Sequence, residues 1–321
     1  MIVVTGAAGF IGSCLVGLLN QRGYSNLILV DDFTRREKMH NLAGKIYGIT
    51  CHRDEFPGWL EKNHSSVKLI FHLGARTDTR EKRTSIFDAL NLNYSKSIWN
   101  ACTRYGIPLI YASSAATYGA GEHGYSDDHQ LIPGLNPLNP YGKSKQDFDL
   151  WVLQQTENPP FWAGLKFFNV YGPNEYHKGR MASVVYHMFQ QIKTHGKVEL
   201  FRSHVPEFAD GEQKRDFIYV LDVVEVCLHL MQQQPRSGIF NVGSGEATSF
   251  YDLAVITFKA LNKAPEISFM DTPEEIRENY QYFTKAKMDK LRAAGCQFPF
   301  RTIEAGVDDY INRFLAVSAY L

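Results

Sequence analysis

The chain has 321 residues, enough for one large α/β domain with a smaller lobe or for two domains, and its 44% hydrophobic and 21% charged residues argue against intrinsic disorder. The 34 basic and 34 acidic residues cancel, which excludes a protein whose whole surface is basic and binds nucleic acid. The five cysteines lie at no metal-ligand spacing and are odd in number, which favours reduced thiols in a cytoplasmic protein over a metal site or a disulfide scaffold.

Strands and helices alternate in the first half of the chain. Residues 2–5 form a short β-branched run that ends at a glycine, which predicts a buried strand. Apolar residues then recur at helical spacing, and Gly23 is a plausible stop signal for this helix. Further buried strands are predicted at 27–30, 68–73 and 109–112, with helices at 10–19 and at roughly 54–63 and 84–105. This alternation predicts an α/β fold with a doubly wound parallel Rossmann sheet, whose carboxyl edge binds ligands.

The second half has fewer strand signals and more glycine, proline and histidine, and we expect it to form a smaller, discontinuous C-terminal substrate lobe. Helical segments are predicted at 180–195, 249–261 and 284–293, and short strands at 216–220 and 239–242 are expected to return to the first sheet. The predicted Rossmann domain is therefore 1–168, with returning segments at about 216–245. The predicted substrate-binding lobe comprises 169–215 and 246–321. No apolar stretch is long enough to span a bilayer, and no signal peptide is expected.

A glycine-rich loop, GAAGFIG at residues 6–12, follows the first strand and opens the first helix. Gly6 permits a tight turn, Gly9 permits close approach of a pyrophosphate, and Gly12 lets helix and strand pack closely. The free N–H groups of the helix end can then hold the phosphates. An ordinary strand–helix turn is the alternative. Asp31, at the expected distance and at the end of the second strand, favours the dinucleotide-binding interpretation.

A tyrosine and a lysine four residues apart, Tyr141 and Lys145, lie on one face of a predicted helix. A nearby ammonium stabilises a phenolate and lowers the tyrosine pKa, so Tyr141 can take a proton from an alcohol while hydride leaves the same carbon. Ser114, next to the end of the strand at 109–112, is placed to hydrogen-bond the same substrate oxygen. Taken alone, a YxxxK pattern is better explained by coincidence than by a catalytic pair. Together with the glycine loop, and in this order along the chain, it indicates redox chemistry on an alcohol.

These motifs resemble the extended short-chain dehydrogenase/reductase family, which uses TGAAGFIG-type loops and a Ser-Tyr-Lys arrangement. Within that family the chain resembles the heptose 6-epimerases along nearly its whole length. The matching stretches are YASSAATYG at 111–119, FFNVYGPNEYHKGRMASV at 167–184, KRDFIYVLDV at 214–223, IFNVGSGEATSF at 239–250 and YQYFT at 280–284. The resemblance implies a cytoplasmic isomerase of lipopolysaccharide core biosynthesis that inverts C6 of an ADP-heptose with tightly bound NADP, assembled as a homo-oligomer, in this family a pentamer.

The resemblance also implies roles for individual residues. Tyr141 matches one catalytic base, Lys145 its partner, Ser114 the supporting serine and Lys178 a second base. The cofactor-binding positions match Gly6, Gly9, Phe10, Ile11, Gly12, Asp31, Asp32, Lys38, Arg53, Leu73, Gly74, Ala75, Asn91, Lys145, Val170 and Lys178. The substrate-binding positions match Ser114, Asn169, Arg180, His187, Phe201, Arg202, Ser203, His204, Arg215 and Tyr280.

Several of these residues also have ordinary structural explanations. Without the resemblance, Lys178 is a solvated lysine in a glycine-containing loop, His187 a core or interface histidine, and Arg215 a surface ion-pair residue. Arg180 stands where the family has a small hydroxyl residue, and residues 202–204 depart from the family pattern, so the exact sugar stays open. A carboxylate such as Asp31 is typical of NAD binding, whereas Lys38 and Arg53 favour NADP because cations neutralise a 2′-phosphate.

The same fold carries other functions. A UDP-sugar 4-epimerase is the closest alternative, and a nucleotide-sugar 4,6-dehydratase is disfavoured because Ser114 is followed by two alanines where dehydratases have an acid. A non-catalytic nucleotide-sensing regulator typically loses the active tyrosine or lysine, and this chain keeps both.

Overall fold

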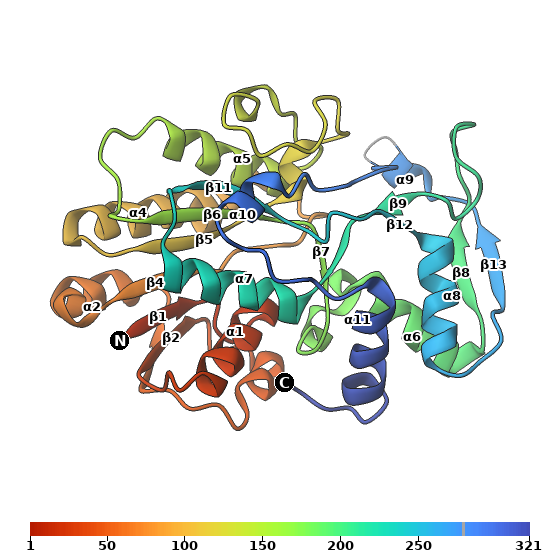
Figure 1. Cartoon of the computed structure of the whole chain (residues 1–321), viewed down its shortest axis with the longest axis horizontal. Helices are drawn as coiled ribbons and strands as arrows, with labels where there is room; N and C mark the ends of the chain where they lie inside the picture. The colour runs from red at the N-terminus through yellow and green to blue at the C-terminus, as the bar shows by residue number, and fades with distance from the viewer. Residues whose placement is uncertain (278–279) are drawn as a thin grey trace.

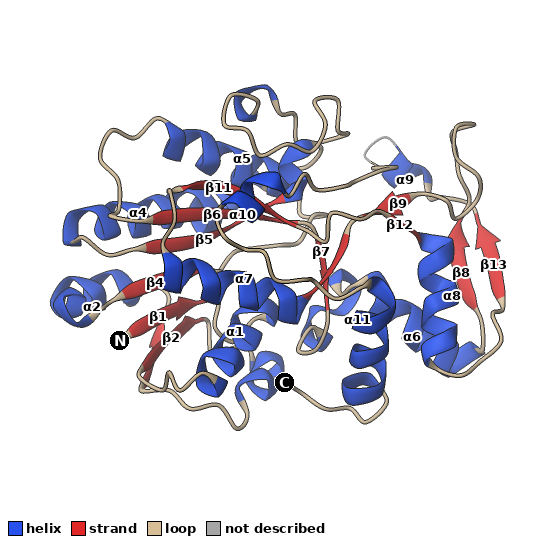
Figure 2. Ribbon diagram, in the orientation of Figure 1, coloured by secondary structure: helices blue, strands red, loops and turns tan. Residues whose placement is uncertain are grey.

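A computed structural model describes residues 1–277 and 280–321 and contains a seven-stranded sheet in the order β11-β6-β5-β4-β1-β2-β3 (Figures 1 and 2). Every neighbouring pair in this sheet is parallel. The strands are β1 (Ile2–Thr5), β2 (Leu27–Asp31), β3 (Ile49–His52), β4 (Leu69–His72), β5 (Leu109–Ser114), β6 (Trp162–Phe167) and β11 (Gly238–Val242). The strand order reverses between β1 and β4, which confirms the predicted α/β doubly wound sheet and puts the ligand crevice at their carboxyl ends.

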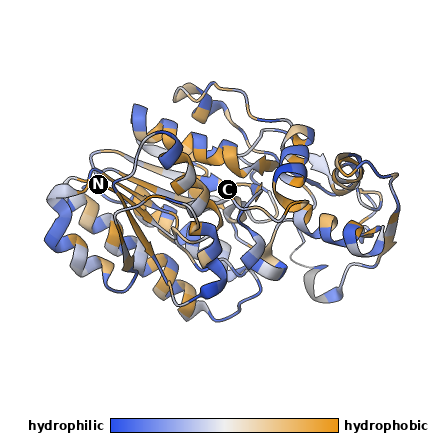
Figure 3. Cartoon of the chain, turned by 90° about the horizontal axis from the view of Figure 1, so that it is seen from below, coloured by the Kyte–Doolittle hydropathy of each residue, from blue (hydrophilic) through white to orange (hydrophobic). Residues whose placement is uncertain are grey.

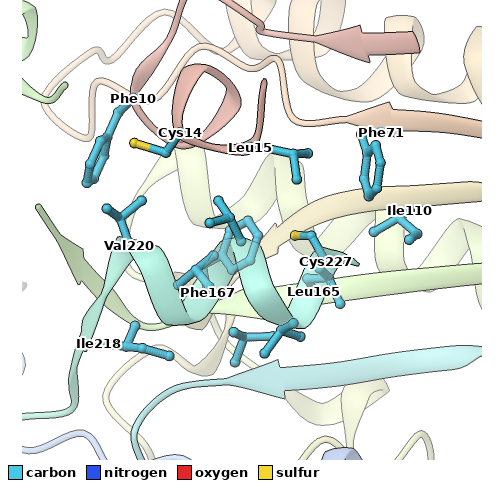
Figure 4. Close-up of a cluster of buried hydrophobic side chains, with 14 of the residues drawn as sticks. Phe10, Cys14, Leu15, Phe71, Ile110, Leu165, Phe167, Ile218, Val220 and Cys227 are labelled. Carbon is cyan, nitrogen blue, oxygen red and sulfur yellow. The ribbon is translucent and has the colours of Figure 1, made fainter. Parts of the chain in front are cut away.

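Helices cover both faces of the sheet. On one face, α1 (Phe10–Gln21) packs against α7 (Val220–Gln233), and Figure 4 shows Ile110 of β5 in this cluster with Leu15 and Cys227. Successive strand residues point to opposite faces, and Tyr111 accordingly lies against Trp99 of α4 (Tyr94–Tyr105) and Phe148 of α5 (Pro140–Leu153). Because both faces are covered, the strands are nearly continuous hydrophobic runs, as their colour in Figure 3 shows.

A buried ion pair joins the sheet to α5 behind the strand that carries Ser114. The ammonium of Lys166 on β6 lies 2.8 Å from the carboxylate of Asp149, and neither side chain is exposed. Asp149 also accepts hydrogen bonds from Ser113 (2.7 Å) and Tyr111 (3.1 Å), and Lys166 donates to Thr117 (2.7 Å). Both charges are therefore compensated, and the contacts fix α5 against β5 and β6.

A smaller lobe lies at the right of Figure 1. It contains the parallel pair β8 (Val198–Phe201) and β13 (Ile267–Met270), the helices α6 (Val184–His195) and α8 (Phe250–Ala260), and the antiparallel pair β9 (Lys214–Arg215) and β12 (Thr248–Ser249). The other α-helices are α2 (Phe56–Asn63), α3 (Thr84–Phe87), α9 (Glu274–Arg277), α10 (Asp289–Ala293) and α11 (Ile303–Tyr310). Two 3₁₀ helices, η1 (Arg36–Leu42) and η6 (Tyr176–Met181), and one π-helix, η3 (Asp88–Asn93), also carry residues of the candidate site.

Three sequence-based expectations are corrected by the structure. The strand β11 joins the main sheet as expected, but β10 (Phe217–Tyr219) pairs with β7 (Asn169–Tyr171), because β11 occupies the edge beside β6. The predicted helix at 180–195 begins at Val184, where Ser183 caps it by accepting from Tyr186 N–H at 3.2 Å. The predicted helix at 284–293 is helical only in α10, because the backbone N–H groups of Thr284 and Ala286 bond to Lys214 and Asp216 instead. Among the described residues, no helix has the length and apolar character needed to cross a membrane.

Candidate active site

The glycine loop has the geometry that a pyrophosphate site needs. Gly6 has φ +67°, and a Cβ added there would lie 2.6 Å from the Cα of Gly74 on the neighbouring strand end. A Cβ on Gly12 would lie 2.1 Å from the carbonyl oxygen of Gly6. Gly9 is the N-cap of α1 and offers no side chain to its first N–H groups, which lack intrahelical partners. The Gly9 N–H donates to the Gly6 carbonyl at 2.9 Å, whereas Phe10 and Ile11 present their backbone N–H groups at a positive helix end, which fits a dinucleotide phosphate.

Two carboxylates at the end of β2 are each paired with a cation. Asp31 is buried, accepts from Ala8 N–H at 2.9 Å and lies 3.0 Å from the ammonium of Lys38 on η1. Asp32 lies 3.8 Å from the guanidinium of Arg53. Four of the predicted cofactor-binding residues, Asp31, Asp32, Lys38 and Arg53, are thus brought together at one strand end.

The loop after β4 runs beside the glycine loop. Gly74 donates from its backbone to the Thr5 hydroxyl at 3.2 Å, and Leu73 and Ala75 flank it. Asn91, on η3, is buried and donates to Arg76 O and Ser144 Oγ, both at 3.0 Å, while it accepts from Arg76 N–H at 2.8 Å. The Asn91 amide is therefore engaged by the protein and braces this loop against α5.

The Ser-Tyr-Lys set lies where β5 ends and α5 begins. Asn139 caps α5 by accepting from Gly142 N–H at 2.8 Å, which fixes Tyr141 in the first turn. Lys145 is buried, and its ammonium donates to the carbonyl of Ala112 at 2.7 Å. Burial lowers the pKa of Lys145 to about 8, although the Asp149 carboxylate opposes this shift.

The expected lowering of the tyrosine pKa is wrong for this structure. Burial raises the pKa of Tyr141, and only a hydrogen bond with Ser114 acts in the opposite direction. The Lys145 ammonium, one helical turn after Tyr141, donates to the Ala112 carbonyl. The structure does bring Ser114 and Tyr141 together, as a proton-transferring pair requires.

Lys178 lies over the glycine loop. It is part of η6, and its ammonium is 5.1 Å from the centroid of the Phe10 ring. The pKa of Lys178 is lowered by burial, and the nearby Glu175 carboxylate opposes this shift. Glu175 is itself buried and accepts from the Ser183 hydroxyl at 2.7 Å and from Gly172 N–H at 3.2 Å. Lys178 is therefore not a solvated loop lysine, and a lowered pKa suits an amine that exchanges protons.

Four predicted substrate residues gather in the smaller lobe. The buried guanidinium of Arg215 lies 5.6 Å from the ring centroid of Tyr280 and 5.7 Å from that of Phe250. The Tyr280 ring in turn lies 6.4 Å from Phe201 and 6.0 Å from His204. Aromatic rings beside a guanidinium can hold a base by stacking and its phosphates by charge.

Two predicted arginines form ion pairs on the surface instead. Arg180 lies 3.1 Å from Asp78, and Arg202 lies 3.3 Å from Asp271 and 3.6 Å from Asp210. The other predicted substrate and cofactor positions are more dispersed. Asn169 and Val170 lie on β7, Ser203 bonds to Val205 O after β8, and His187 is a half-buried residue of α6 beside Tyr186.

Three residues that the sequence did not single out belong to the same region. The hydroxyl of Tyr282 lies 2.8 Å from Nδ1 of His204, and its place in the YQYFT stretch was a usable signal. Glu175 faces Lys178, and Asn41 links η1 to η6 through His177. Both look like ordinary polar loop residues in the sequence, because their partners lie far along the chain.

Comparison with known proteins finds relatives that match nearly the whole chain. A heptose epimerase relative from Fusobacterium nucleatum, an ADP-L-glycero-D-manno-heptose-6-epimerase, is 43% identical over 98% of both chains. A relative of the same name from Nitratidesulfovibrio vulgaris is 45% identical over 99% of both chains. The crystal structure of the Helicobacter pylori ADP-L-glycero-D-manno-heptose-6-epimerase superposes with a TM-score of 0.82 at 27% identity, covering 97% of this chain and 95% of that one.

The fold is shared more widely. The UDP-N-acetylglucosamine 4-epimerase of Methanobrevibacter ruminantium superposes equally well, with a TM-score of 0.82 over 98% of both chains, at 22% identity. Residues 2–243, which contain the glycine loop, Ser114, Tyr141, Lys145 and Lys178, match the model of a single family. The chain therefore belongs to the NAD dependent epimerase/dehydratase family.

Proposed function

We propose that the chain inverts C6 of the heptose in ADP-D-glycero-D-manno-heptose and so produces ADP-L-glycero-D-manno-heptose. The observation that carries the proposal is the presence of two acid–base candidates on separate elements. Tyr141 contacts Ser114 at the start of α5, and Lys178 on η6 lies over the glycine loop. Relatives of 43–45% identity carry the name of this activity.

The cofactor is a nicotinamide dinucleotide, and it supplies reversible hydride transfer at the substrate carbon when bound. The residues of the chain manage the proton. Ser114 hydrogen-bonds the C6 oxygen. Tyr141, as the phenolate that the positive charges of Lys145 and of the oxidised nicotinamide would favour, would take the proton from that oxygen as the alcohol is oxidised to a ketone. The hydrogen bond from the buried Lys145 ammonium to the Ala112 carbonyl holds this positive charge near the Ser114–Tyr141 pair.

Return of the hydride to the other face completes the inversion. C6 is exocyclic, so a small rotation presents the opposite face of the ketone and turns its oxygen to another side of the pocket. One acid–base group cannot reach both oxygen positions. Lys178, as the ammonium, gives a proton of its own to the oxygen in this second position, and proton exchange with water afterwards restores both Tyr141 and Lys178. No reduced cofactor accumulates, because the same hydride leaves and returns.

This arrangement favours the 6-epimerase over its alternatives. A 4-epimerase turns the whole sugar over and can use Tyr141 for both half-reactions, so it needs no amine at the position of Lys178. A 4,6-dehydratase needs an acid beside the serine, and Ala115 and Ala116 follow Ser114 here.

The proposed cofactor is NADP. Asp31 is already paired with Lys38 and with Ala8 N–H, and Asp32 with Arg53, so the carboxylates are neutralised before a ribose arrives. Lys38 and Arg53 can leave these carboxylates and bind a 2′-phosphate instead, which favours the phosphorylated cofactor. Denaturation of purified protein should release NADP(H), and Lys38→Ala should weaken NADP binding more than NAD binding. Release of NAD(H) alone, with equal affinities in Lys38→Ala, would contradict this preference.

The assembly and location stay predictions of the family resemblance. We propose a cytoplasmic homo-oligomer, a pentamer in the related enzymes, that takes a nucleotide sugar and neither nucleic acid nor membrane as partner. Sedimentation velocity of the purified full chain measures the assembly directly, and a monomer at all concentrations would contradict it.

The test of the function is a product assay with the cofactor-loaded protein. ADP-D-glycero-D-manno-heptose and UDP-galactose are incubated separately, and the epimers are resolved by chromatography. The expected result is conversion of the ADP-heptose to an equilibrium mixture, without accumulation of reduced cofactor. Conversion of UDP-galactose alone would identify a 4-epimerase, and stoichiometric reduced cofactor would identify a dehydrogenase.

A further inference from the structure

A buried amide joins the glycine loop to the loop that carries Lys178. Asn41, at the end of η1, is 1% exposed. Its side-chain nitrogen donates to the carbonyl of Ala8 in the glycine loop and to the carbonyl of Asn174, each at 3.0 Å. The same nitrogen lies 3.2 Å from Nδ1 of His177, the residue directly before Lys178. One side chain thus contacts both sides of the cofactor and base region.

The second residue of this network holds the start of η6 in place. Asn174 is fully buried and adopts φ +72°, a left-handed conformation. This conformation costs free energy and persists only where the surrounding contacts enforce it. Its amide donates to the Ser13 hydroxyl on α1 at 3.0 Å and accepts from Leu321 N–H at 2.9 Å. The turn before η6 is therefore fixed from α1, from η1 and from the segment at residue 321.

His177 serves this network as a neutral acceptor. Burial, together with the nearby ammonium groups of Lys38 and Lys178, lowers the pKa of His177 to about 4. A neutral imidazole with its proton on Nε2 offers Nδ1 to the Asn41 amide, which has two hydrogens for three acceptors and therefore shares one of them in a three-centre bond. Because His177 immediately precedes Lys178 on one short helix, a shift of His177 moves the amine over Phe10.

We infer that Asn41 is a positioning residue for Lys178, which it holds at the glycine loop by bridging Ala8, Asn174 and His177. The inference rests on the proposed function, because it assigns Asn41 a task in the second proton transfer. Asn41 touches neither reacting atom in this account. Its effect passes through the placement of η6, where a displacement of about 1 Å can cost up to ~100-fold in rate.

A double-mutant cycle between Asn41 and Lys178 tests the inference. Asn41→Ala should reduce kcat for epimerisation of ADP-D-glycero-D-manno-heptose by ~10-fold, with KM and the content of bound cofactor nearly unchanged. In the Lys178→Met background, the same change should reduce the residual rate by less than about twofold, because residues that act through one group are not additive. If Asn41→Ala does not fold, Asn41→Ser carries the same cycle.

Asn20→Ala is the matched control. Asn20 also joins α1 to the segment after η1, donating to Tyr24 O at 2.9 Å and to Ile46 O at 2.8 Å, and its described contacts do not include η6. Both variants should lower the melting temperature, but only Asn41→Ala should lower kcat. Equal kcat in Asn41→Ala and wild type, or losses that multiply with Lys178→Met, would overturn the inference. An inactive wild type would overturn the proposed function instead.

Discussion

Tyr141 and Lys178 should each be indispensable if protons are exchanged on two sides of the substrate. Tyr141→Phe and Lys178→Met remove only a hydroxyl and an amine, and each should reduce kcat for epimerisation by ~100-fold or more. Chromatography of the two ADP-heptose epimers gives the rates, and cofactor release on denaturation shows whether the site is still loaded. Cofactor binding should survive in Tyr141→Phe. It should weaken somewhat in Lys178→Met, because the amine lies over Phe10 of the glycine loop.

Lys143→Met is the control for a lost lysine. Lys143 is on the same helix as Tyr141, its side chain is 68% exposed, and its ion pair among the described residues is with Asp147. Such a surface pair contributes little, so activity should be unchanged. A Lys178→Met enzyme that epimerises ADP-heptose as fast as Lys143→Met would return Lys178 to the status of a structural residue.

At the scale of one element, two glycines of α1 should respond in opposite ways to alanine. A Cβ on Gly12 would lie 2.1 Å from the Gly6 carbonyl, so Gly12→Ala should force the glycine loop away from the strand and abolish cofactor retention. At Gly17 the nearest atom to a Cβ is the Lys45 side chain at 3.4 Å, and Gly17→Ala should be neutral or stabilise by up to ~1 kcal/mol through helix propensity. Urea unfolding and the content of bound cofactor distinguish the two. Equal cofactor retention in both variants would refute the role of the loop.

At the scale of the whole molecule, stability should fall in acid because histidines are buried in the neutral form. His72 is buried at the end of β4 and contacts Thr5 (2.8 Å) and Ser95 (3.0 Å), which joins β1, β4 and α4. Burial, with a smaller contribution from Lys145, lowers the pKa of His72 to about 3.

Proton linkage gives the direction in which pH changes the free energy of unfolding. The unfolded chain binds a proton at His72 near the ordinary pKa of about 6.5, whereas the folded chain does not until pH is about 3. The free energy of unfolding therefore keeps its full contribution from neutral His72 above about pH 6.5. It loses this contribution as pH falls from about 6.5 to about 3. Urea unfolding at several pH values should show a shallower acid loss in His72→Gln than in wild type. Identical slopes would mean that His72 titrates alike in both states.

Short segments of the sequence were enough to predict many features of this protein. The apolar runs at β1, β2 and β5, the glycine spacing of residues 6–12 and the four-residue separation of Tyr141 and Lys145 are each complete within one short segment. Their geometry follows from the periods of strand and helix, so the Rossmann sheet, the tight glycine turn and the place of Tyr141 and Lys145 on one helix were predictable. The sequence also placed Lys178 in the candidate site, but only through its resemblance to relatives.

Tertiary structure decided whatever depends on partners distant in the chain. The strand β10 pairs with β7 because β11, some twenty residues later, takes the sheet edge. Lys145 faces the Ala112 carbonyl, Arg180 pairs with Asp78, and Asn41 meets Asn174 across 133 positions of sequence. No periodicity in the sequence records such contacts, because burial and hydrogen bonding are settled only when separate elements pack together.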